Sequence, residues 1–175
     1  TCQSCHMDQG DHGVKTAWGT YGLQLTPSDD KEWAADQTTL LKGLGILDSS
    51  GKPGPRLDAI KKIDLARVSQ TEWQKERDSL ARICTKCHSS NYAKGELARG
   101  DQMIKEADRM MAEAITIISD LYRDGKLEKP KGQASDYPDL LTLSEVRTPI
   151  EKALLRMFKH ERSSAFKGAF HMSPE

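Results

Sequence analysis

The sequence predicts an all-α fold with long helices in its C-terminal half. Strand signals are nearly absent along the 175 residues, whereas patterns that start and stop helices recur. An apolar stripe also repeats with heptad spacing between residues 104 and 121, which places its members on one side of a single helix. These observations together favour a helical domain.

Helix starts are marked at three places. The segment TPSDD at 26–30 precedes a helix predicted over 33–44. Ser69 and Glu72 have the spacing of a capping box and open a helix that continues through Trp73 and Leu80 to the CTKCH pentapeptide. Thr148–Glu151 is a second such box, with Pro149 at the first helical position. It starts a helix that bears the apolar residues Ile150, Leu154, Leu155 and Phe158.

The longest predicted helix extends from about Tyr92 to Arg123 and stops at Asp124-Gly125. A flanking line of apolar residues, Met103, Met110 and Ile117, widens its stripe. Two interpretations stay open: a helix packed within its own domain, or one that also meets neighbouring subunits. The apolar positions that alternate by three and four are Ile104, Ala107, Met111, Ala114, Ile118 and Leu121.

Length and charge limit the class of protein. Two loops rich in Gly, Pro and Lys, at 48–56 and 125–139, are too short to divide domains, so residues 1–175 are expected to form one domain. Lys+Arg and Asp+Glu are equal at 26 each, so no net field favours nucleic acid or an anionic membrane. No apolar run is long enough to span a bilayer, so no membrane-spanning segment is expected, and these residues contain no recognisable signal-peptide pattern.

All four cysteines lie in two pentapeptides, CQSCH at 2–6 and CTKCH at 84–88. Two Cys-x-x-Cys pairs can supply four zinc ligands, but zinc has no use for a histidine after both pairs. A redox Cys-x-x-Cys normally occurs once, at the start of a helix in a βαβ context that this chain lacks. Cys-x-x-Cys-His is the attachment signature of c-type haem, and two copies that use every cysteine favour this interpretation.

The haem interpretation assigns roles to six residues. Thioether bonds would form at Cys2, Cys5, Cys84 and Cys87, and His6 and His88 would be the proximal iron ligands. It also accounts for a composition with only 37% hydrophobic and 6% aromatic residues, because two large apolar macrocycles would fill the centre. The expected fold is an all-α multihaem cytochrome c with long C-terminal helices. Haem is attached to cysteine outside the energy-conserving membrane, so an extracytoplasmic location such as the periplasm is expected.

The candidate distal iron ligands are the three remaining histidines, His12, His160 and His171. His160 and His171 could serve these two haems or others. His160 and His171 lie among Phe158, Phe166 and Phe170, an apolar setting that suits haem contact. His12 follows Asp11, and the two residues allow two interpretations. Either His12 ligates iron while Asp11 is solvated, or the pair accepts protons beside an open iron site.

The chain resembles the C-terminal half of the hydroxylamine oxidoreductase family, octahaem cytochromes that include hydrazine dehydrogenase and related nitrite reductases. The resemblance covers most of the 175 residues. It implies an all-α multihaem subunit that forms homotrimers, and it implies that this chain, with two haem motifs, is a fragment truncated at both ends, with more haems expected in the full subunit. The similar segments are residues 1–23 (TCQSCHMDQGDHGVKTAWGTYGL), 73–115, 121–126 (LYRDGK), 138–151 (PDLLTLSEVRTPIE) and 166–175 (FKGAFHMSPE).

The resemblance also implies a reaction, the oxidation of a small nitrogen hydride such as hydroxylamine or hydrazine. Bis-His haems would pass the electrons on to a redox partner cytochrome, and one haem with an open distal face would carry out the chemistry. An Asp-His pair lies over that face in the family and is similar to Asp11-His12, which would leave His160 and His171 as the distal ligands. The oxidising members carry a tyrosine bonded to the catalytic haem, expected here beyond residue 175.

Two other functions stay open. One is a dihaem electron carrier with no substrate, since two bis-His haems need four histidines and the chain has five. The other is a reductase of the same fold that carries electrons inward to nitrite.

Overall fold

The computed structural model describes residues 23–24, 29–62, 66–67, 69–142 and 148–170, and it is built almost wholly from helices. Within these residues no helix is both long and apolar enough to cross a membrane. The two strands have two residues each and pair in parallel, with Leu23 opposite Ala66. In chain order the elements are β1 (Leu23–Gln24), α3 (Lys31–Gly43), α4 (Arg56–Lys62), β2 (Ala66–Arg67), α5 (Gln70–Cys84), α6 (Ser90–Arg123), α7 (Pro149–Arg156), the π-helix η2 (Met157–Arg162) and α8 (Ser163–Phe170).

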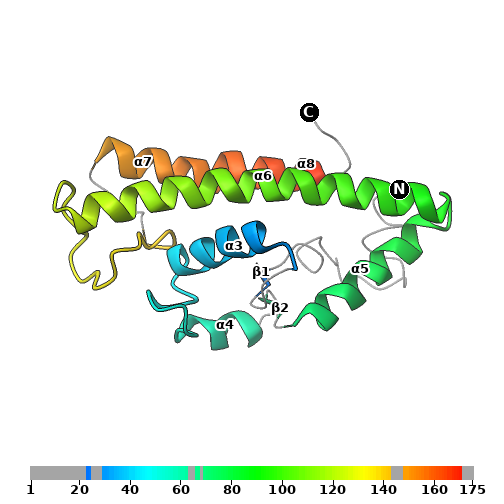
Figure 1. Ribbon diagram of the computed structural model, residues 1–175, viewed down its shortest axis with the longest axis horizontal. Helices are drawn as coiled ribbons and strands as arrows, with labels where there is room; N and C mark the ends of the chain where they lie inside the picture. Colours follow the sequence, from blue (N-terminus) through cyan, green and yellow to red (C-terminus); the bar gives the residue numbers. More distant parts are fainter. Residues whose placement is uncertain (1–22, 25–28, 63–65, 68, 143–147, 171–175) are drawn as a thin grey trace.

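Helix α6 is the axis of the fold, and the other helices are arranged around it (Figure 1). Helices α7, η2 and α8 form one continuous helical segment that runs antiparallel to α6, while α3 packs along another side. Helix α5 meets α6 only near the N-terminal end of α6 and diverges from it (Figure 1). The main core lies between α3, α6 and α7, and its buried side chains include Met111, Ile115, Ile118, Leu40, Leu41, Leu140 and Leu154.

The predicted helix starts are confirmed by their caps. The Ser69 hydroxyl accepts a hydrogen bond from the Glu72 amide at 3.1 Å, and Thr148 and Glu151 form a full capping box. Helix α3 begins at Lys31, capped by the Asp30 carboxylate. The long helix begins at Ser90, two residues earlier than the apolar pattern indicates, because the Ser89 hydroxyl caps it.

The heptad stripe of α6 faces the core as predicted. Ile104, Ala107, Met111 and Ile118 are buried. On the flanking line Met110 is 43% exposed and Ile117 is 50% exposed. The described part of this chain therefore covers the stripe but leaves these two apolar side chains open.

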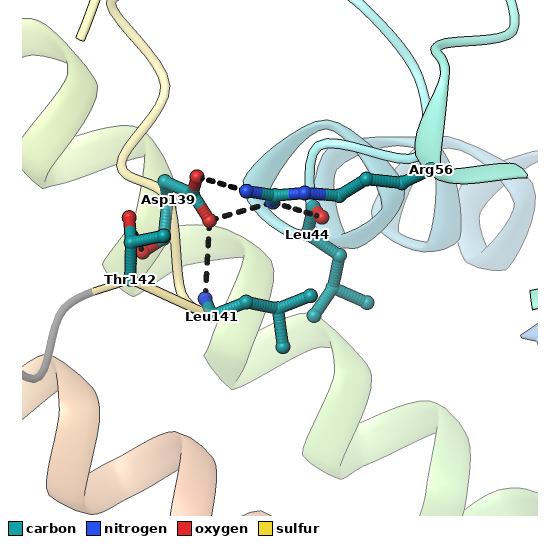
Figure 2. A network of polar contacts seen from close by, with 5 residues as sticks. All are labelled: Leu44, Arg56, Asp139, Leu141 and Thr142. Carbon is teal, nitrogen blue, oxygen red and sulfur yellow. Dashed lines mark hydrogen bonds and ion pairs between the residues drawn. The ribbon is translucent and has the colours of Figure 1, made fainter. Parts of the chain in front are cut away.

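The two predicted loops are joined by an ion pair between Arg56 and Asp139. The Arg56 guanidinium donates to both Asp139 carboxylate oxygens, at 2.7 and 2.6 Å, and to the Leu44 carbonyl at 2.9 Å (Figure 2). Burial acts to raise the pKa of Asp139 and is the largest single influence on it. The hydrogen bonds and charge of Arg56, together with hydrogen bonds from Leu141 and Thr142, outweigh burial and hold that pKa below its ordinary value. Gly45 has φ of +64°, and a Cβ there would lie 2.6 Å from the Arg56 Nη1, so glycine is required for this approach.

The helix predicted from Thr148 continues further than its sequence signals indicate. Its α-helical part ends at Arg156, and the chain then passes through η2 and α8 without a break. Phe158, predicted in the same α-helix, lies in the π-helical part. The sequence from Met157 to Arg162 contains no Gly or Pro, so it has no signal for this change of hydrogen-bonding pattern.

Candidate haem-binding site

The CTKCH motif forms the corner between α5 and α6. Cys84 is the last residue of α5, and the chain then makes a tight turn in which the Cys87 and His88 amides both donate to the Cys84 carbonyl, at 3.2 and 3.0 Å. The Ser89 hydroxyl then caps α6. The two cysteines and His88 are therefore brought together on one turn that is closed by helix caps on both sides.

The corner has the two thiols, the imidazole and the open surface that a thioether-linked haem requires. Cys87 and His88 are exposed and Cys84 is half-buried, so a large planar group can approach all three. The His88 imidazole is stacked on the Tyr92 ring, with centroids 4.8 Å apart and an angle of 30° between the planes. Two thiols three residues apart, followed by an accessible imidazole, match the chemistry of c-type attachment. The residues present thus fit the cofactor.

Helices α5 and α6 are held together beside this corner by Arg77 and Asp101. Both Arg77 Nη atoms donate to the Asp101 carboxylate at 2.6 Å, and the guanidinium lies 5.2 Å from the centroid of the Trp73 ring. None of the α5 side chains whose burial is described is fully buried. Helix α5 is therefore fixed by specific contacts rather than by a core of its own, and its apolar residues Trp73, Leu80 and Ile83 are half-buried.

A shallow, open hollow of about 500 Å³ lies along α5 and is lined by polar and charged residues of that helix. Lys75 and Arg82 are its cations, and the Gln74 amide donates to the Asp78 carboxylate at 2.8 Å. Haem propionates are carboxylates, and cations of this kind can bind them. The lining residues are Gln70, Thr71, Gln74, Lys75, Asp78 and Arg82.

His160, a predicted distal ligand, is exposed on η2 and lies far from the corner. Arg162, two residues further on, donates to the Asp108 carboxylate of α6 at 2.7 Å. Asp108 is 18 residues along α6 from Ser90, or about 27 Å at 1.5 Å per residue. The two axial ligands of one iron face each other across a single porphyrin. Within one chain, His160 therefore does not reach an iron held by His88.

Sequence reasoning missed the buried charge that fixes η2. Asp108 is only 3% exposed, and it accepts hydrogen bonds from Arg162 and, at 3.0 Å, from the Trp33 indole of α3. Burial, together with the charge of Asp108, raises the pKa of Asp36 on the same helix as Trp33. The paired carboxylate joins α3, α6 and η2, and it sets the position of the segment that carries His160.

The other predicted site residues lie outside the described residues. They are Cys2, Cys5, His6, Asp11, His12 and His171. The structure therefore describes one of the two haem motifs and one of the three candidate distal ligands.

Comparisons with known proteins support haem attachment at the CTKCH motif. Residues 57–138, which include CTKCH, match the model of a family described as "Seven times multi-haem cytochrome CxxCH". The predictions of an all-α multihaem cytochrome fold and of haem c as cofactor are confirmed, and the chain has a haem-based redox role.

One relative is similar over nearly the whole chain. It is described as "Probable nitrite reductase-hydroxylamine oxidoreductase fusion protein" from Kuenenia stuttgartiensis, and it is 28% identical over 165 residues. The aligned region is 91% of this chain but only 18% of the relative, so the chain spans less than a fifth of that protein's length. No solved structure matches the chain.

Proposed function

We propose that this chain is part of a multihaem oxidoreductase that oxidises hydroxylamine, or hydrazine, and passes the electrons along bis-His haems. The observation that carries the proposal is the CTKCH corner, built for covalent haem, in a chain similar to a protein whose name includes hydroxylamine oxidoreductase. The resemblance of the sequence to that enzyme family points the same way.

In this proposal the described corner holds one electron-transferring haem. Cys84 and Cys87 form the two thioether bonds, which fix the macrocycle against the turn, and His88 supplies the proximal imidazole. Bound haem c supplies an iron that changes its charge by one electron at a time. The Arg77–Asp101 pair joins α5 and α6, the two helices that flank this turn.

The second motif and the distal ligands complete the proposed site. Cys2, Cys5 and His6 would hold another haem, and His160 and His171 would be distal ligands. Because Asp108, the partner of Arg162, lies far along α6 from the CTKCH corner, His160 would bind an iron other than that of His88. Asp11 would accept protons released from the nitrogen-bound substrate, and His12 would orient or shuttle them. His12 as a distal ligand is the alternative.

We also propose the setting in which this site works. The protein is a homotrimer in the periplasm or an equivalent extracytoplasmic compartment, and a partner cytochrome receives its electrons. The exposed Met110 and Ile117 on α6 support a contact with neighbouring subunits, because the described part of the chain leaves them uncovered.

Addition of hydroxylamine to the oxidised, haem-loaded protein tests the proposal. Electrons should appear on the haems, seen as the sharp visible absorption bands of ferrous haem c. If every iron stays low-spin and no haem is reduced, the chain is an electron carrier. Asp11→Asn should slow turnover while leaving the haem content unchanged, and an unaltered rate would remove Asp11 from the proposed role.

A reductase is the second candidate, and the relative's name favours it because that name also includes nitrite reductase. Nitrite added to the chemically reduced protein discriminates the two. Rapid reoxidation of the haems by nitrite, with no reduction by hydroxylamine, would favour the reductase.

A further inference from the structure

We propose that Tyr92 is a positioning residue for the iron ligand His88, an inference that rests on the proposed haem attachment at Cys84 and Cys87. The two rings are stacked, with centroids 4.8 Å apart and planes inclined by 30°. This separation is within the range in which aromatic rings attract one another. No sequence motif assigns a role to Tyr92.

The local backbone builds this stack. His88 is held from one side, because its amide donates to the Cys84 carbonyl at 3.0 Å. Tyr92 is held from the other side, because its amide donates to the Ser89 hydroxyl at 3.2 Å in the first turn of α6. The two rings therefore meet across one helix cap, and neither backbone can shift without breaking a hydrogen bond.

Core packing does not explain the position of Tyr92. Its side chain is 54% exposed, although it is a large aromatic residue, and the ring contact that the structure gives it is with His88. Its neighbours Asn91 and Ser90 on α6 are exposed as well. An aromatic ring kept on the surface against the ligand has its main contact there, so its contribution concerns the imidazole.

The stack matters because an imidazole binds iron through a lone pair that lies in the plane of its ring. The ring can rotate about the iron–nitrogen bond, and groups that touch it select one orientation and tune the iron. The Tyr92 ring covers one face of the imidazole, so it restricts that rotation and excludes water from that face.

The test uses the complete haem-loaded protein and two substitutions at one position. Tyr92→Phe keeps the ring and removes the hydroxyl, whereas Tyr92→Leu removes the ring. Ile150→Leu is a matched control, because Ile150 is an apolar residue on α7 that is 41% exposed and has no contact with the CTKCH corner in the described structure. Three quantities are measured: the haem mass on the peptide with Cys84 and Cys87, the midpoint potential of each haem, and the low-spin g values of the ferric irons.

Tyr92→Phe and Ile150→Leu should match the wild-type protein in all three quantities. Tyr92→Leu should keep the haem but shift the potential and the g values of one iron only. If Tyr92→Leu leaves both unchanged, or if Tyr92→Phe shifts them as much as Tyr92→Leu does, the positioning role of the ring is wrong. If the wild-type peptide carries no haem mass, the proposed function fails at its first step, which is a separate outcome.

Discussion

Arg77 on α5 and Asp101 on α6 form a two-pronged ion pair in which both hydrogen bonds measure 2.6 Å. The side chains are only 11% and 21% exposed, so water competes weakly for them. Arg77 lies two turns before Cys84 on α5, and Asp101 lies three turns after the start of α6. The pair therefore holds together the two helices that flank the CTKCH turn.

Asp101→Asn should lower the free energy of unfolding by about 1–3 kcal/mol, because it removes the negative charge that faces a largely covered guanidinium. Urea unfolding followed by helical circular dichroism measures the loss. The matched control is Glu96→Gln, which removes the charge opposite Arg99 in an i,i+3 pair whose arginine is 68% exposed. It should change stability by less than about 1 kcal/mol. Equal effects from the two substitutions would contradict the role given to Asp101.

The double substitution Cys84→Ser, Cys87→Ser should remove one covalent haem, seen as the loss of one haem mass in the intact protein. Neither side chain belongs to the buried core, so the remaining helices should keep their circular dichroism signal. The matched control is Thr85→Ser, a change between the two cysteines that keeps both thiols and should retain every haem. A double variant with the full haem mass would show that these thiols do not attach the cofactor.

The elements that the sequence could predict are those governed by local chemistry. Ser69 and Thr148 cap helices because their hydroxyls need only an amide three residues away. The buried side of α6 followed from the spacing of its apolar residues, and the position of CTKCH at a helix end followed from the helix before it. The short helix α4 has no such cap signal, and it was not predicted.

The contacts that fix the site depend instead on how the helices pack. Arg77 pairs with a residue 24 positions away, and Asp108 with one 54 positions away, and many other charged residues of this chain are equally suitable partners on sequence grounds. The stacking of Tyr92 on His88 spans only four residues. It still depends on a change of direction at Ser89 that residue types alone do not specify.

Stability above pH 10 should depend on Tyr122, whose hydroxyl donates to the Glu151 carboxylate at 2.6 Å in the core. Burial, and then the hydrogen bond and charge of Glu151, raise the pKa of Tyr122 above its ordinary value of 10. Between pH 10 and the raised value, the folded chain keeps a proton that the unfolded chain loses. The stabilisation is therefore complete below pH 10 and is lost as the pH rises through the folded pKa.

Tyr122→Phe should flatten this alkaline decline, and at pH 7 it should cost about 1–3 kcal/mol because a Glu151 oxygen loses its donor. Denaturant unfolding at pH 7 and at several values above pH 10 measures both effects. A variant whose free energy of unfolding falls as steeply above pH 10 as that of the wild type would show that Tyr122 does not cause the decline.

The exposed apolar side chains of Met110 and Ile117 on α6 lead to a prediction about the assembly of subunits. Met110→Glu together with Ile117→Glu should convert the proposed homotrimer into monomers, because two charges would have to be buried in an apolar contact. Light scattering during gel filtration measures the mass in solution. The control Gln102→Glu adds a charge at an exposed polar position of the same helix and should leave the mass unchanged. Both substituted positions lie on the solvent side of the described chain, so the monomers should keep their helical content. A trimer that survives both glutamates would place the subunit contact elsewhere and leave α6 as a helix that serves its own chain alone.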